Sequence, residues 1–392
     1  MEPLRDRLRL PDADALLLAL TVVIKIGVLA IGAAAYAMAT GRLDAIGALE
    51  TWNRWDAPHY LDLVVFGYRA VDDGTLIGPD GYRSVYPGDL PLYIVFYPLF
   101  PWLATAVNAV VGDPLVSAFV VSSVASLFVA PLMYRLVRED EDVGVALRAA
   151  WFLLIFPTAY FLHIGYTESL FMALVLGSFL AGRTRHWWIA GLLGGLAALT
   201  RINGLVLLPA LAAEAFTQWY EQPRGQRRLR MEWLAIGLVG VGFLAYIGLN
   251  LAIYGEPFTF LRVQREHWFK ELAPPWEAIS AAVGWLRSDD PDTVFIHGSM
   301  ELAFVVIGLL AVLISAFRLR PSYFAWTAGN WLLFTSTSFL LSMPRYTLTL
   351  FPVMVLLALP TRRVWLLAAL SAVSLAAFVY FAIRFATGSW AF

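Results

Sequence analysis

The chain has 392 residues, of which 60% are hydrophobic and only 15% charged, and its mean hydropathy is +0.69. This composition excludes an ordinary soluble globular protein and predicts an integral membrane protein. The net charge of −1 favours no class of partner, and the absence of cysteine excludes disulfides, thiolate nucleophiles and cysteine metal sites.

Apolar windows long enough for a helix to cross the hydrocarbon core of a bilayer follow one another along the whole chain. We expect an all-α membrane protein with about eleven spanning helices. They are placed at 15–40, 114–137, 145–163, 167–182, 187–200, 203–217, 232–253, 299–317, 322–341, 346–360 and 364–385.

The apolar stretch Leu92 to Val111, rich in rings and prolines, is either a further span or a helix lying at the outer surface. The positive-inside rule favours the surface helix, because every short arginine cluster then falls on the cytoplasmic side together with the N-terminus. These clusters hold Arg5, Arg7, Arg9, Arg135, Arg138, Arg148, Arg183, Arg185, Arg224, Arg227, Arg228, Arg230, Arg318, Arg320, Arg362 and Arg363.

This topology predicts a single membrane domain, 1–392, with two large outer segments at 41–113 and 254–298. Both segments are rich in Trp, Tyr, Asp and Arg, and the other outer connections are short. Neither an internal repeat nor a nucleic-acid signature is evident in the sequence. We therefore expect the polar machinery to lie on the outer face.

The stretch "TWNRWDAPHYLDLVVFGY", Thr51 to Tyr68, has two interpretations. In the structural one, Asp56 is the N-cap of an amphipathic surface helix that runs from His59 and ends at Gly67. The tryptophans of the stretch, Trp52 and Trp55, are then interfacial anchors.

The functional interpretation of the same stretch rests on helical spacing. Trp52, Asp56, His59 and Tyr60 follow one another at steps that keep them on one helix face. Rings can stack on the apolar face of a pyranose, and a carboxylate can accept a hydroxyl proton. The spacing therefore indicates one wall of a sugar-binding cleft.

Glu168, in "HIGYTESLF", stands at the outer start of a predicted span. A first-turn acid complements the helix dipole, which is the structural alternative. With His163 and Tyr166 close by, the acid also fits an ionisable cluster at the mouth of a helix bundle, where function is the default hypothesis.

Arg201 and Arg345 each occupy a short outer connection, where the positive-inside rule disfavours arginine. Either guanidinium could bind phosphate through its planar fork, with Asn203 opening the next helix. The alternative is an ion pair with Glu168 or Asp56.

In the second outer segment, Arg265 and His267 are further candidates for phosphate binding, and Trp268 is a candidate for substrate binding. Metal ligation through histidines and carboxylates is conceivable, but no ligand spacing is diagnostic. We expect neither a metal nor another cofactor.

Five blocks in order carry a family resemblance: "RWDAPHYLDLVVFGY", "FYPLFPWLATAV", "FPTAYFLHIGYTESLFMALVLGSFLA", "GGLAALTRINGLVLLPAL" and "SMPRYTLTLFPV". They resemble the PIG-V mannosyltransferases of GPI-anchor biosynthesis, in the GT-C superfamily of multi-span glycosyltransferases. The resemblance implies a polyprenyl-phosphate sugar donor, juxtamembrane helices in the first outer loop and Asp56 as the catalytic base. It also assigns the second-loop acid to Glu168 and the C-terminal arginine motif to Arg345.

The resemblance predicts an inverting mannosyltransferase whose acceptor is a lipid-linked or cell-surface glycan. We expect a multi-pass protein of a bacterial inner membrane, with its active site on the extracytoplasmic face and the lipid bilayer as its surroundings. A partner subunit is neither indicated nor excluded. The alternatives are a lipid or solute transporter, which needs polar groups along its spans, and a non-catalytic glycolipid-binding subunit.

Overall fold

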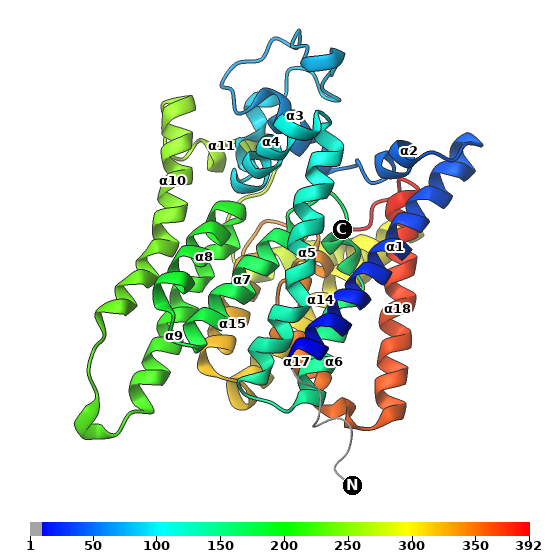
Figure 1. The fold of residues 1–392 in the computed structure, drawn as a ribbon. Helices are drawn as coiled ribbons and strands as arrows, with labels where there is room; N and C mark the ends of the chain where they lie inside the picture. Colours follow the sequence, from blue (N-terminus) through cyan, green and yellow to red (C-terminus); the bar gives the residue numbers. More distant parts are fainter. Residues whose placement is uncertain (1–9) are drawn as a thin grey trace.

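The computed structural model describes residues 10–392, which form a bundle of helices (Figure 1). The one pairing of strand type found in these residues is an isolated antiparallel bridge between Leu272 and Thr337. The predicted all-α membrane fold is confirmed. The predicted cytoplasmic arginines Arg5, Arg7 and Arg9 lie outside the described residues.

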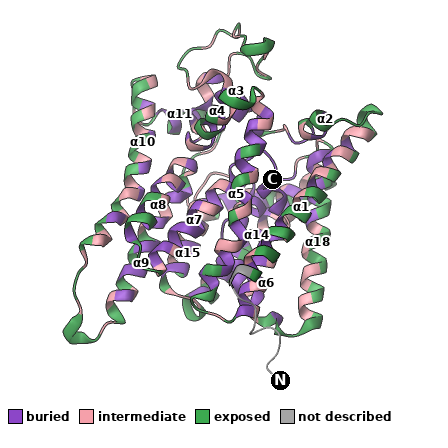
Figure 2. Ribbon diagram, viewed as in Figure 1, coloured by how far each residue is buried: buried purple, intermediate pink, exposed green. Residues whose placement is uncertain are grey.

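Five runs of helix in the described part of the chain are long and apolar enough to cross a membrane. They contain α1 (Leu10–Thr40), α5 (Pro114–Arg138), α10 (Gly237–Tyr254, within Met231–Tyr254), α14 (Glu301–Arg318, within Pro291–Arg318) and α18 (Val364–Ala386). Figure 2 shows α1, α10 and α18 with largely exposed residues on the outside and buried residues gathered on α5 and α7. The exposed helices α1, α10 and α18 therefore lie around a more buried centre that includes α5 and α7.

The other predicted spans form shorter helices, so the predicted number of eleven is not confirmed. The shorter helices are α6 (Val143–Leu154), α7 (Glu168–Arg183), α8 (Trp187–Thr200), α9 (Leu207–Tyr220), α15 (Pro321–Thr335), α16 (Met343–Leu348) and α17 (Pro352–Ala358). The predicted span 145–163, for example, leaves the α-helical path after Leu154. Non-helical backbone is tolerated at membrane depth where protein covers it, and residues 155–167 are almost entirely buried.

One end of the bundle holds the short helices of the first outer segment: α2 (Ala45–Glu50), α3 (Asp56–Phe66) and α4 (Leu99–Val111), with α11 (Thr259–Glu266) close to them (Figure 1). The stretch predicted to lie at the surface begins as the 3₁₀ helix Leu90–Val95 and continues as α4. The 13 residues of α4 extend about 20 Å. This is shorter than the length a membrane span needs, and the position of the helix at the outer surface stays a prediction.

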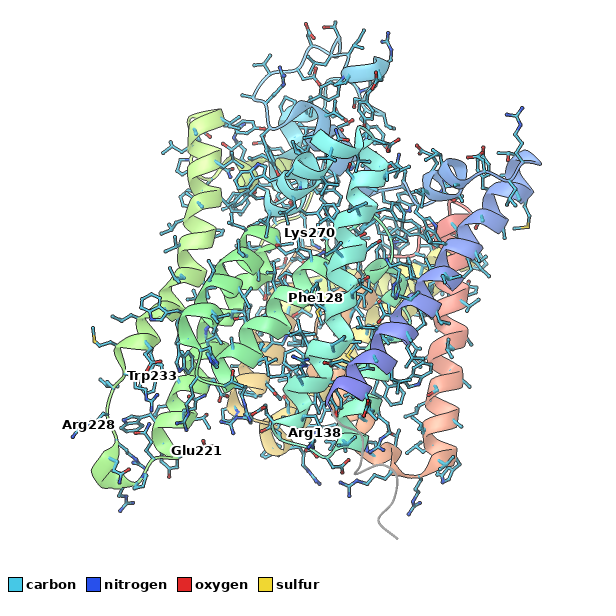
Figure 3. All side chains as sticks on the ribbon, viewed as in Figure 1. Phe128, Arg138, Glu221, Arg228, Trp233 and Lys270 are labelled. Atoms are coloured by element: carbon cyan, nitrogen blue, oxygen red, sulfur yellow. The ribbon has the colours of Figure 1, made fainter. Side chains whose placement is uncertain are left out.

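The opposite end of the bundle gathers the basic connections (Figure 3, where Arg138 and Arg228 are labelled). Asp140 pairs there with Arg183 at 2.7 Å and with Arg320 at 3.9 Å. Connections far apart in the sequence therefore meet at one end, as the predicted topology requires.

Candidate functional site

A cavity of about 840 Å³ lies at the end of the bundle that carries α3. Its walls come from α3, the 86–97 segment, the connection between α8 and α9, the 260–272 segment and residues 333–346. The predicted site residues that line it are Trp55, Asp56, His59, Tyr60, Arg201, Asn203, Arg265, Trp268 and Arg345.

The backbone at Trp55 sets the direction in which α3 begins. Trp55 is the N-cap, with φ 55° and ψ −106°, a conformation that non-glycine residues rarely adopt and that is costly unless the surroundings hold it. Asp56 is the first residue of the helix, so its prediction as the N-cap of a helix from His59 is wrong. Gly67, with φ 68°, ends the helix as predicted. The early start places the Asp56 carboxylate in the first turn, facing the cavity.

Trp52 does not belong to the site, contrary to the prediction of one helix face. Because α3 starts only at Asp56, Trp52 lies in the preceding turn and not on the helix. Its side chain is 1% exposed and stacks on Phe385 at 5.8 Å between ring centroids. It packs the core behind the cavity.

A chain of alternating charges forms the wall below α3. The Arg345 guanidinium donates through Nη1 to Asp56 Oδ2 at 2.7 Å and through Nε to Glu168 Oε1 at 2.6 Å. Arg201 donates to the same Glu168 oxygen and, at 2.9 Å, to Thr167 Oγ1. The ion-pair alternative for both arginines is therefore what the structure shows. Phosphate contact remains a prediction.

These contacts fix the charge of the two groups nearest the cavity. Burial raises the pKa of Asp56, but the charge of Arg345 and its hydrogen bond outweigh burial and hold that pKa below its ordinary value. Burial lowers the pKa of Arg345, whereas Glu168 and Asp56 raise it well above its usual range. Asp56 is a carboxylate and Arg345 a cation at neutral pH.

Arg345 is held by α16, whose start depends on a buried acid that the sequence analysis missed. Glu301, at the beginning of α14, accepts the backbone N–H groups of Ser342 at 2.7 Å and Met343 at 2.8 Å. Ser342 has φ 70° and turns the chain into α16. The sequence feature that could have identified Glu301 is its position as an acid inside the predicted apolar span 299–317.

Three further predicted residues lie behind the cavity wall. Glu168 and His163 are fully buried, and Tyr166, also buried, donates its hydroxyl to the carbonyl of Arg54. The carbonyl of His163 accepts from Lys25 Nζ at 3.2 Å. None of the three lines the cavity, so any influence on a ligand acts through the residues that do.

His59 stands in a group of rings that line the cavity. Its imidazole lies 5.3 Å from Tyr86, 5.0 Å from Phe96 and 5.6 Å from Trp268 between centroids. Burial lowers the pKa of His59, and the nearby Asp56 only partly opposes this. The neutral imidazole thus belongs to an aromatic wall suited to a sugar face.

The second outer segment contributes unequally. Arg265 and Trp268 line the cavity, but His267 is exposed outside it. Lys270, which the sequence analysis did not select, also lines the cavity. The sequence feature that could have drawn attention to Lys270 is the rarity of lysine, since the chain has only two.

Asn203, at the start of the α8–α9 connection, is bonded within the protein. Its amide donates to Asn330 Oδ1 at 3.0 Å. No group of three or more metal-ligating His, Asp or Glu side chains occurs within the described residues.

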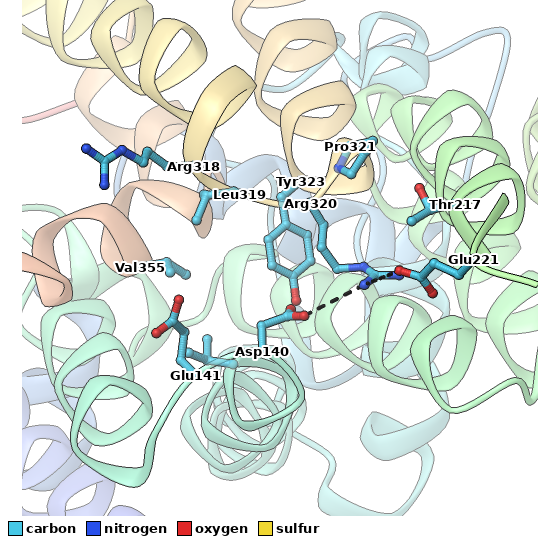
Figure 4. A pocket seen from close by; sticks show the side chains of 11 residues that line it. Asp140, Glu141, Thr217, Glu221, Arg318, Leu319, Arg320, Pro321, Tyr323 and Val355 are labelled. Atoms are coloured by element: carbon cyan, nitrogen blue, oxygen red, sulfur yellow. Dashed lines mark hydrogen bonds and ion pairs between the residues drawn. The ribbon is translucent and has the colours of Figure 1, made fainter.

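A smaller pocket, of about 400 Å³, lies at the opposite end of the bundle (Figure 4). Arg320 crosses it and pairs with Asp140 and, at 3.2 Å, with Glu221. Its principal cation is thus already matched by acids, and aromatic lining comes only from Tyr323.

Comparison with known families adds an independent observation. Residues 91–250, less than half of the chain, match the family described as dolichyl-phosphate-mannose-protein mannosyltransferase. No curated protein matches the chain.

Among solved structures, the chain is similar to the oligosaccharyltransferase of Archaeoglobus fulgidus at low identity. The apo form matches with 13% identity and a TM-score of 0.44, over 94% of this chain and 56% of that protein. Its complex with zinc and sulfate matches with 13% identity and a TM-score of 0.47, over 94% of this chain and 53% of that protein. The complex of the archaeal oligosaccharyltransferase AglB with an inhibitory peptide and a dolichol-phosphate matches with 13% identity and a TM-score of 0.43, over 94% of this chain and 55% of that protein. The chain spans about half the length of these proteins.

The partial family match and the all-helical membrane fold are the findings on which the functional proposal rests.

Proposed function

We propose that the protein is an inverting glycosyltransferase that moves mannose from a polyprenyl-phosphate carrier to a hydroxyl of a lipid-linked or cell-surface glycan. The observation that supports this best is the cavity of about 840 Å³ in which a carboxylate, guanidinium groups and rings meet at the end of the bundle. The matched family is described as acting with a dolichyl-phosphate mannose. The mannose donor, the acceptor and the outer orientation are parts of the proposal, as is the narrower resemblance to PIG-V enzymes.

Asp56 is the proposed base. The acceptor hydroxyl must lose a proton as it attacks the anomeric carbon, and an ionised carboxylate within reach can accept it. The Asp56 side chain is 27% exposed, so it stays open to the cavity while Arg345 holds one of its oxygens. Arg345 is thereby proposed to orient the base.

The donor's phosphate is proposed to lie away from Asp56, near Arg201 and Arg265. In an inverting displacement the base and the leaving group stand on opposite sides of the anomeric carbon. Phosphate is a good leaving group at neutral pH, so cationic neighbours that stabilise its developing charge are needed, rather than a general acid. A β-linked donor would give an α-mannoside.

The aromatic lining is proposed to bind the sugar. Trp55, Trp268 and His59 with its neighbouring rings offer flat apolar faces, which suit the apolar face of a hexose. The reaction is proposed to need no divalent metal.

The proposal is tested with purified protein, radiolabelled polyprenyl-phosphate mannose and a lipid or glycan acceptor extract. Wild-type protein is expected to transfer label with or without EDTA. Asp56→Asn keeps the shape and removes the base, so transfer is expected to fall by about 10²–10⁴-fold or more while donor binding is retained. Full transfer by Asp56→Asn would refute the base, and absence of transfer from any polyprenyl-phosphate sugar would refute the activity.

A further inference from the structure

We propose that Lys270 binds the phosphate of the lipid-linked donor, an inference that rests on the proposed function. Most cations that line the cavity are already paired with acids. Lys270 is the cation that remains available for a phosphate. Figure 3 labels Lys270 in the half of the molecule that carries α3.

The charges of the cavity wall are largely matched already. Asp56 and Glu168 are shared between Arg345 and Arg201, so these four charges cancel. Two further acids, Asp89 and Glu271, also line the cavity. Arg265 is exposed and lies 3.5 Å from Glu266. A phosphodiester brings one negative charge and, after transfer, leaves more as a phosphomonoester. Binding it therefore calls for a further cation.

Lys270 makes no ion pair with any acid in the described part of the chain. Its ammonium lies 5.4 Å from the ring centroid of Tyr346 and 5.8 Å from that of Phe339. Lys270 acts electrostatically on the buried Glu301, but both oxygens of that acid already accept backbone N–H groups. The ammonium thus has cation–π contacts but unused hydrogen-bond donors.

The backbone around Lys270 is held in place independently of its side chain. The N–H of Lys270 donates to the carbonyl of Gln264 at 3.1 Å, and Phe269 before it has φ 53°. The next residues form the bridge with Thr337, in which the N–H of Ser338 donates to the carbonyl of Glu271 at 3.0 Å. Changing the Lys270 side chain should leave these backbone hydrogen bonds intact.

Arg201 approaches the same ring as Lys270. Its guanidinium carbon lies 5.8 Å from the Tyr346 centroid. Two cations beside one ring, with one of them unpaired, form a site for a phosphate group. The hydrogen bond to Asp56 comes from Arg345, so the proposed phosphate site uses cations other than the one that holds the base.

The test is direct binding, which does not depend on turnover. Detergent-solubilised protein is titrated with a polyprenyl phosphate and, separately, with the uncharged polyprenol of the same chain length. Wild-type protein is expected to bind the phosphate at least 10-fold more tightly. Lys270→Gln is expected to lose most of that preference while binding polyprenol normally, and Lys270→Arg is expected to restore it.

Arg262→Ala is the matched control. Arg262 is exposed in the same outer segment, lies 3.5 Å from Glu256 and does not line the cavity. Its variant should keep the preference. Equal loss in Arg262→Ala and Lys270→Gln would show a diffuse charge effect, and an unchanged preference in Lys270→Gln would overturn the proposal. If the binding result stands while no sugar is transferred, the failure lies in the proposed function.

Where transfer is measurable, Lys270→Gln should raise the KM for the donor by about 10-fold, a typical loss for one charge-assisted hydrogen bond. The KM for the acceptor should stay unchanged. An effect on the acceptor KM alone would overturn the assignment.

Discussion

At the scale of single residues, the site depends on Arg345. One guanidinium holds carboxylates from two segments far apart in the sequence, Asp56 on α3 and Glu168 on α7. Phe161 and Tyr166 lie under it, 4.5 Å and 4.9 Å from the guanidinium carbon to their centroids. Two carboxylates and two rings thus hold the group, which makes its position specific.

Replacing Arg345 by lysine should therefore be severe, although the charge is kept. A single ammonium cannot reproduce the planar fork that serves both carboxylates, so one buried acid is left without its partner. We expect a loss of about 3–5 kcal/mol of stability and of nearly all transfer, measured by thermal unfolding and by label incorporation. Arg362→Lys, in an exposed pair with Asp142 at 3.3 Å, is the control and should change neither. If the Arg345→Lys variant unfolded at the same temperature as the wild-type protein, the bridging role of Arg345 would be contradicted.

The pH dependence of transfer follows from the lowered pKa of Asp56. The base acts when ionised, so activity is lost as the pH falls through the pKa of Asp56 in the folded protein. Since this pKa lies below the ordinary 3.8, the rate should stay flat on the acid side down to about pH 4.5. A pH–rate profile in detergent tests this. An acidic limb centred between pH 5 and 7 would argue against Asp56 as the base.

At the scale of elements, the packing of α8 against α10 holds one wall of the cavity. A Cβ on Gly242 would lie 2.0 Å from the carbonyl oxygen of Gly195, so the two backbones meet closely, as small residues allow in membranes. Beyond its C-terminal end, α10 leads into α11, which bears Arg265. The close contact of two helices is thus connected to the position of the site.

Gly242→Ala should separate the two helices. We expect a loss of about 1–3 kcal/mol, seen as a lower unfolding temperature, because backbone must move to admit the methyl group. Gly240→Ala on the same helix is the control, since its Cβ would meet nothing within 4 Å. It should be neutral or slightly stabilising. Equal behaviour of the two variants would show that α8 and α10 do not pack this closely.

At the scale of the whole molecule, the two ends of the bundle differ in chemistry. One end has the cavity with rings and Asp56, and the other has the arginine-rich connections joined by ion pairs around Asp140. By the positive-inside rule we expect the arginine-rich end to face the cytoplasm. With that predicted orientation, the proposed donor would be a lipid of the outer leaflet.

The absence of cysteine makes this orientation measurable. Single cysteines are placed at Val71, which is 80% exposed at the end that carries Asp56, and at Gln226 in the exposed connection between α9 and α10. In intact cells, a membrane-impermeant maleimide should label Val71→Cys and leave Gln226→Cys unlabelled until the membrane is permeabilised. The reverse pattern would place the cavity on the cytoplasmic side.

Composition and hydropathy alone determined the membrane class and the helical fold, because a bilayer demands apolar helices whatever their neighbours. Hydropathy gave wrong helix bounds where a segment is covered by other parts of the protein and not by lipid. The predicted span 145–163 is interrupted after Leu154, since surrounding helices cover the irregular backbone that follows.

For the site, residue type and spacing pointed to Asp56, Glu168, Arg201 and Arg345 as an unusual charged set. Only the tertiary structure decided that one arginine joins both acids, that Trp52 packs the core and that Lys270 faces the cavity. Sequence spacing describes one helix at a time, whereas these contacts join segments separated by up to 289 residues. Their pairing depends on how the whole bundle closes.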